Sequence, residues 1–238
     1  MPHVRSPERN RLMLERAALA LAALCFVLVF VLNGRPYFTT SSFPPRGIRD
    51  PHIAMQMVRS VGEIDAILGD APSADREVMR IKQYIDFAFI AAYAALFVVV
   101  SIVLMRVSRW AIAIGIFGAL AALHDVMEDR DILQIVNAPL SAVTGPMISH
   151  LHLMSVVKWM SAAIAIGLVG VFTLRARKWY FRLIGAVDLL AAAMILWGVN
   201  DNPMLVWAGM PLAAGMIANA ATLKFLVAEL TPSEPAKT

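Results

Sequence analysis

The sequence has few charged residues for its length and a single cysteine. Only 16% of its 238 residues are Asp, Glu, Lys or Arg, against about 25% in an average soluble domain. The single thiol, Cys25, excludes an intrachain disulfide and a metal site built from cysteines. No Walker loop, Rossmann glycine pattern, GxSxG or HExxH sequence is present, so no motif assigns an enzyme class.

Apolar residues are abundant instead, and they are gathered in blocks. The sequence is 59% hydrophobic and its mean hydropathy is +0.68. The blocks are long enough to cross a bilayer, which takes about 20 helical residues. The sequence therefore predicts an all-α, polytopic membrane bundle of about six transmembrane helices in one domain. The expected spans are residues 12–33, 81–106, 110–128, 147–174, 179–198 and 204–228. For residues 179–228 the alternative is one span with a re-entrant segment.

Residues 34–80 form the only large polar segment, which we expect outside the bilayer. Asp50 followed by Pro51 is typical of a helix start. From there apolar residues recur at spacings of three and four. This pattern predicts an amphipathic helix over 51–68 on the outer side of the membrane, where a protein partner could dock. Ser73 is the expected N-cap of a helix that continues into the second span.

The basic residues are distributed unevenly between the connections. The connections at 106–109 and 175–182 are rich in Lys and Arg, whereas 129–146 contains only Arg130 and 199–203 contains neither. The positive-inside rule then places both termini in the cytoplasm, and a bacterial inner membrane is the expected location. This topology accounts for the net charge of +4, and nucleic acid is not an expected partner.

Ionisable residues within the apolar spans are the candidates for function, because they are costly to keep in hydrocarbon. We expect Lys158 near the midplane, and a buried lysine needs a carboxylate partner such as Asp86, Asp125 or Glu128. Spans two, three and four would contribute most of this polar cluster, near the outer side. Its expected members are Asp86, Tyr93, His124, Asp125, Glu128, Lys158 and Asp188.

Several roles for this cluster stay open at the level of sequence. It can hold helices together by ion pairing alone. It can bind a metal ion, for which His124, Glu128 and His150 are the candidate ligands. It can also perform acid–base chemistry on a lipid-like substrate, or couple protons to transport. The leading hypothesis is a non-enzymatic membrane protein that binds or passes a small or lipid-like ligand. A membrane enzyme and an accessory subunit of a membrane complex are the alternatives.

Overall fold

The computed structural model describes residues 7–39, 47–200 and 203–231, and all regular secondary structure within these ranges is helical. Six of the described helices are long and apolar enough to cross a membrane. They are α1 (Pro7–Leu32), α4 (Ala74–Leu104), α5 (Ile112–Val136), α6 (Gly145–Leu174), α7 (Trp179–Gly198) and α8 (Met204–Leu230). The prediction of an all-α membrane bundle is confirmed, and both α7 and α8 have the length of complete spans.

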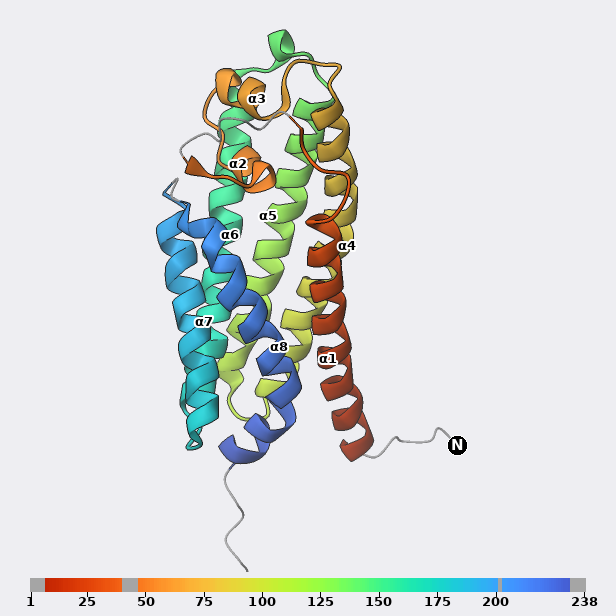
Figure 1. The fold of residues 1–238 in the computed structure, drawn as a ribbon. Coiled ribbons are helices and arrows are strands. Elements are labelled where there is room, and N and C mark those ends of the chain that lie inside the picture. The colour runs from red at the N-terminus through yellow and green to blue at the C-terminus, as the bar shows by residue number, and fades with distance from the viewer. Residues whose placement is uncertain (1–6, 40–46, 201–202, 232–238) are drawn as a thin grey trace, which may run out of the picture.

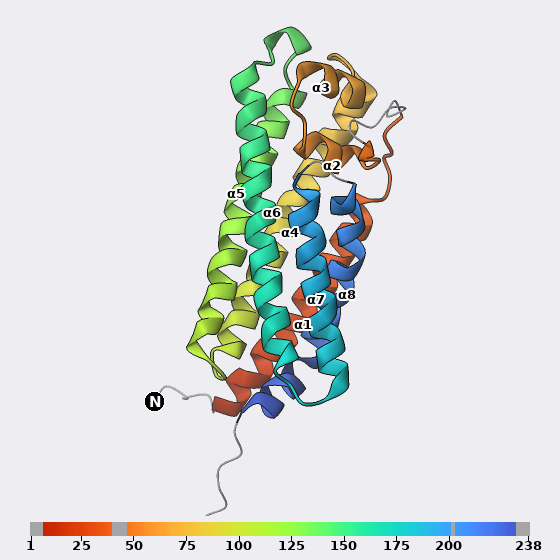
Figure 2. The same ribbon diagram turned by 90° about the vertical axis from the view of Figure 1, so that its left-hand side faces the viewer.

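The six long helices form a ring in the order of the chain. From α4 to α8 each long helix packs against the next, and α1 packs against both α4 and α8. The first residues of α1 and the last residues of α8 lie at the same end of the bundle (Figures 1 and 2). The described termini of the bundle are therefore on one side of the membrane.

The helices differ in length, and this difference shapes the other end of the bundle. α7 has 20 residues, or about 30 Å, which equals the hydrocarbon core of a bilayer. α4 has 31 residues, or about 46 Å. Figure 1 shows α4, α5 and α6 rising well above the upper ends of α1, α7 and α8. The short helices α2 (Pro51–Gln56) and α3 (Val61–Leu68) fill the step between the two groups.

The segment 51–68 was predicted as one amphipathic helix, and the structure divides it into two. Asp50 caps α2 as expected, accepting a hydrogen bond from the Ile53 amide at 3.0 Å. The chain then leaves the helical path, and Ser60 caps α3 by accepting from the Glu63 amide. Ser60 is thus a second N-cap within the apolar repeat. Its hydroxyl accepts from the Glu63 amide, which in one continuous helix would donate to a backbone carbonyl of the preceding turn.

The third span was predicted to end at residue 128, but α5 continues for two more turns to Val136. Ile132, Ile135 and Val136 are fully buried in the apolar core beneath α2 and α3. The guanidinium of Arg76 donates to the carbonyls of Ile135, Val136 and Ala138 and so caps the end of α5. The acidic run that resembled a helix end therefore lies well inside α5.

Four tryptophans mark the two edges of the apolar surface. Trp110 and Trp179 lie at the end shared with the termini, and Trp197 and Trp207 lie near the opposite ends of α7 and α8. Their exposed fractions are 58–74%. Exposed tryptophan at both ends of apolar helices is typical of the interfacial belts of membrane proteins. The belts support a membrane that covers the length of α7.

Candidate functional site: a buried acidic cluster

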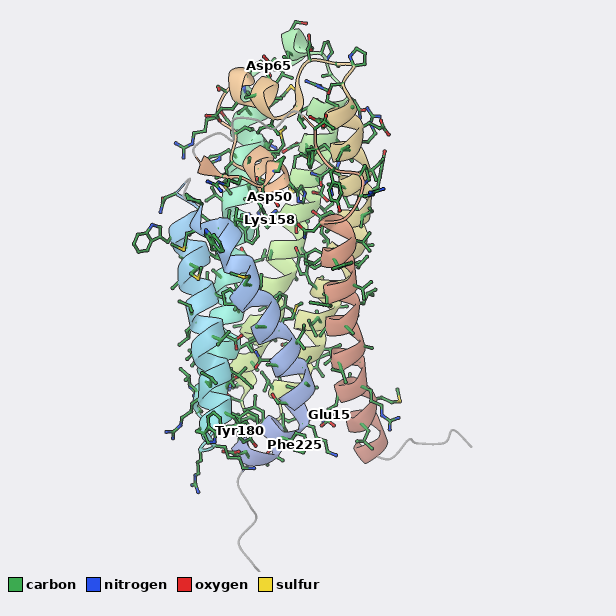
Figure 3. The ribbon with its side chains drawn as sticks, viewed as in Figure 1. Glu15, Asp50, Asp65, Lys158, Tyr180 and Phe225 are labelled. Carbon is green, nitrogen blue, oxygen red and sulfur yellow. The ribbon has the colours of Figure 1, made fainter. Side chains whose placement is uncertain are left out.

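Three neighbouring helices bring ionisable side chains together in the upper half of the bundle. α4 contributes Asp86, α6 contributes Lys158, and α5 contributes a stripe of three acids that face inward at spacings of three and four. We call this group the acidic cluster. Its members are Asp86, Asp125, Glu128, Asp129 and Lys158, and each is at most 5% exposed. Figure 3 shows Lys158 below Asp50 at the start of α2, and Lys158 lies near the middle of α6.

Lys158 is the positive centre of the acidic cluster. Its Nζ lies 2.9 Å from Asp125 Oδ1 and 2.7 Å from Glu128 Oε1. The expected pairing of this lysine with carboxylates is therefore present. Tyr93 lies two turns below Asp86 on α4 and donates its hydroxyl to Asp125 Oδ2 at 2.8 Å. Asp125 is thus held from two sides, by an ammonium and by a phenol.

Asp129 is held by nothing comparable. Its exposed fraction is 0%, and neither carboxyl oxygen has a hydrogen-bond partner within the described part of the chain. One oxygen each from Asp86, Asp125 and Asp129 lie within 4.8 Å of one another. Buried carboxylates are normally paired or hydrogen-bonded. Asp129 is therefore a buried carboxyl group with both oxygens available to bind a ligand.

Helix α2 covers the acidic cluster from above. His52 Nε2 lies 3.6 Å from Asp86 Oδ2 and 3.3 Å from Gln83 Oε1. One turn further along α2, Gln56 Oε1 accepts a hydrogen bond from Trp159 Nε1 at 3.0 Å. The His52 side chain is 18% exposed. It therefore lies between the buried carboxylates and the surroundings of the bundle.

The charge balance of the acidic cluster is strongly negative. With every group ionised, four carboxylates face one ammonium, an excess of three negative charges. Among the described residues, Lys158 is the only Lys or Arg that forms an ion pair with these four acids. Like charges confined in a low-dielectric site repel strongly. The acidic cluster therefore needs additional positive charge, as bound cations or as protons.

Three of the predicted site residues, His124, His150 and Asp188, lie apart from these contacts. His124 Nδ1 contacts the carbonyl of Leu120 on its own helix at 2.7 Å. His150 is exposed and pairs with Asp131 at 2.6 Å. The predicted ligand set His124, Glu128 and His150 is not brought together, since Glu128 faces Lys158. The one group of potential ligands in the described structure is Asp86, Asp125 and Asp129.

Asp188 belongs to a separate polar site deeper in the bundle. Asn219 Nδ2 donates to Asp188 Oδ2 at 2.7 Å, and Thr173 Oγ1 donates to Asn219 Oδ1 at 3.1 Å. We call these three residues, which join α7, α8 and α6, the Asp188 site. Asp188 and Asn219 border a small apolar pocket of about 50 Å³ whose walls come mainly from α4, α6 and α8. A substituent on Gly215 would meet the Asp188 carboxyl group, so this glycine allows the close approach of α8.

Two contributors to the site were not among the predicted residues. Asp129 lies four residues after Asp125 and so shares its helix face, which was the signal in the sequence. His52 has no such signal, because its approach to Asp86 depends on where α2 folds back over the bundle.

Comparison with known proteins adds no assignment. No protein-family model matches the sequence, and neither a curated protein nor a solved structure shows significant similarity to it. The fold defines the class: a multi-pass, helical integral membrane protein. Any more specific statement about function has to come from the chemistry of the acidic cluster.

Proposed function

We propose that this protein binds a small cationic ligand in the acidic cluster, and that the ligand enters from the side covered by α2. The observation that carries the proposal is the excess of buried carboxylates over ammonium groups, with both oxygens of Asp129 unpartnered in the described structure. A bound cation removes the repulsion and fills the open coordination of Asp129.

A purely structural role explains the acidic cluster less well. Lys158 is already paired with Asp125 and Glu128, at 2.9 and 2.7 Å. A helix-stabilising ion pair needs one carboxylate, or two at most. Asp86 and Asp129 make no recorded contact with the ammonium and still add negative charge at the same place. Residues that raise the free energy of the folded protein without a ligand are the signature of a binding site.

The proposal includes an orientation in the membrane. The end of the bundle that holds the start of α1 and the end of α8 also holds the Arg- and Lys-rich connections at 106–109 and 175–182. By the positive-inside rule that end faces the cytoplasm, in a bacterial inner membrane on this proposal. The acidic cluster then lies toward the outer side, and α2 lies between it and the external medium.

The structure of residues 51–68 bears on the alternative of a protein partner at this segment. Met55 and Met57 are buried at 0% and 2% exposure, within the core shared with α5 and α6. The apolar side chains of α2 and α3 therefore face the bundle. A protein partner at this segment would therefore have to bind the polar side of these helices.

Thermal unfolding of the purified protein tests cation binding directly. The midpoint would be measured in detergent micelles with CaCl₂, MnCl₂, KCl or methylammonium chloride, against choline chloride at equal ionic strength. Binding to the folded state alone raises the midpoint in a saturable way, by RT ln(1 + [L]/Kd) in free energy. We expect at least one of the four salts to do so.

Two variants on α5 supply the matched comparison. Asp129→Asn removes a carboxylate from the acidic cluster, and Asp131→Asn removes one that pairs with His150 outside it. The cation effect should disappear in Asp129→Asn and persist in Asp131→Asn. Equal midpoints in all salts for the unmodified protein would mean that protons alone balance the acidic cluster, and the proposal would be rejected.

A further inference from the structure

The proposed function leaves the kind of cation open, and the arrangement of ligand atoms narrows it. Resting on that function, we infer that the acidic cluster is a site for a hard divalent cation such as Ca²⁺, chelated by Asp86, Asp125 and Asp129. These residues offer one oxygen each, all within 4.8 Å of one another. The sequence-based ligand candidates were histidines, and the structure instead gathers only oxygen donors.

The spacing of the oxygens suits a shared metal ion. Two ligand atoms on one ion are separated by no more than twice the metal–oxygen distance, which is about 4.2 Å for Mg²⁺ and about 4.6–5.2 Å for Ca²⁺. The three oxygens all lie within 4.8 Å of one another, so small side-chain movements suffice to bring them onto one divalent ion.

The chemistry of the donors points the same way. Carboxylate oxygens favour hard cations such as Ca²⁺, Mg²⁺ and Mn²⁺, whereas zinc and copper favour imidazole and thiolate. His52 lies beside Asp86 at 3.6 Å, outside the triangle. A divalent ion also reduces the excess of three negative charges to one, which a monovalent ion does not achieve.

Asp129 distinguishes this group from an ordinary patch of acidic residues. Its side chain is completely buried and reaches the triangle with both oxygens free of hydrogen bonds in the described ranges. Asp125 has its own support from Lys158 and Tyr93, which fixes its orientation. Lys158 also donates to Glu128 Oε1, and Glu128 is not among the three residues whose oxygens lie together. The site therefore combines one ligand whose orientation is fixed, Asp125, with one whose oxygens have no other partner in the described ranges, Asp129.

Equilibrium binding of ⁴⁵Ca²⁺ to the purified protein in micelles tests the inference. We expect one saturable site per chain. Asp86→Asn and Asp129→Asn should each weaken binding by about tenfold or more, since even the loss of a residue that only supports a metal ligand costs about 10–100-fold. Asp131→Asn should bind as the unmodified protein does, and Glu128→Gln should weaken binding less than Asp129→Asn. The unfolding midpoint of each variant in EGTA shows that it is folded.

The outcomes separate this inference from the proposed function. Ca²⁺ binding that is equal in Asp129→Asn and Asp131→Asn would place the ion elsewhere and overturn the assignment of ligands. Stabilisation by K⁺ or methylammonium without any Ca²⁺ binding would overturn the divalent site and leave a cationic ligand in place.

Discussion

The acidic cluster and the Asp188 site are both polar groups inside an apolar bundle, yet they are built on opposite principles. At the Asp188 site one carboxyl group accepts from an amide, which in turn accepts from a hydroxyl, and each helix contributes one side chain. At the acidic cluster four carboxyl groups meet one ammonium, and three of the four come from α5 alone. The first arrangement is a chain of hydrogen bonds that ends on a single carboxyl group, whereas the second gathers four carboxyl groups around one ammonium.

This difference separates polar residues that join helices from polar residues that await a ligand. Interhelical hydrogen bonds in membranes contribute modestly, about 0.6 kcal/mol on average, and need no further partner. An excess of buried charge destabilises the folded protein until something binds. Arg76 and Lys82 support this distinction, because these buried cations are met by backbone carbonyls at the ends of α5 and α1. They act as helix caps and require no counter-ion.

Among the substitutions that test this difference, Lys158→Met should lower the free energy of unfolding most. The change leaves four carboxylates without their only paired ammonium, and breaking a buried ion pair costs about 3–5 kcal/mol. The free energy of unfolding, measured by SDS titration in mixed micelles, should fall by about that amount. Addition of CaCl₂ should recover part of the loss, since a divalent cation can replace the missing charge.

Lys178→Met is the control for Lys158→Met. Lys178 is 59% exposed and lies 3.9 Å from Glu229 at the end of the bundle shared with the termini, so its loss should cost less than about 1 kcal/mol. The double variant Lys158→Met/Glu128→Gln should be more stable than Lys158→Met, because one unpaired carboxylate is removed with the lysine. If Lys158→Met unfolds like the unmodified protein, the acidic cluster is not held together by charge.

Asn219→Leu should have a smaller effect, of about 1–2 kcal/mol, because Asp188 loses its donor and Thr173 loses one of two acceptors. The same SDS titration measures it, and Thr222→Val is the control, since Thr222 bonds only within its own helix. The loss should be the same with CaCl₂ and with EGTA. A loss that Ca²⁺ reverses would mean that the two sites are one system.

The sequence predicts the fold well because membrane spans depend on composition and length, which are local properties. The caps at Asp50 and Ser73 are likewise present where the sequence predicts them. The division of 51–68 and the extension of α5 are different, because both depend on contacts with distant segments. Ile132 and Ile135 extend α5 only because α2 and α3 fold over them and Arg76 caps its end.

The candidate site is predicted in part for a related reason. Residues 124–129 carry two acidic or imidazole stripes, His124 with Glu128 and Asp125 with Asp129, and these lie about 100° apart on the helix. Periodicity finds both stripes, but the rotation of α5 in the bundle decides which one faces α4 and α6. The structure turns Asp125, Glu128 and Asp129 inward and leaves His124 against its own backbone.

Asp70 is a solvent-exposed carboxylate and serves as the reference for the two buried sites. Its replacement should change the stability of the protein least. Asp70 Oδ1 accepts hydrogen bonds from the amides of Leu140 and Ala71, both at 2.8 Å, in the connection before α4. These bonds favour the ionised form and lower the pKa of Asp70 below its ordinary value of 3.8. A lowered pKa in the folded state means that the carboxylate stabilises the protein above about pH 4, and that this contribution is lost as the pH falls through the lowered value.

The difference in unfolding midpoint between the unmodified protein and Asp70→Asn should therefore be constant from pH 7 to 5 and shrink toward pH 3. A difference that stays constant to pH 3, or that depends on CaCl₂, would show that Asp70 is not the isolated, solvent-exposed carboxylate that the comparison with the acidic cluster needs.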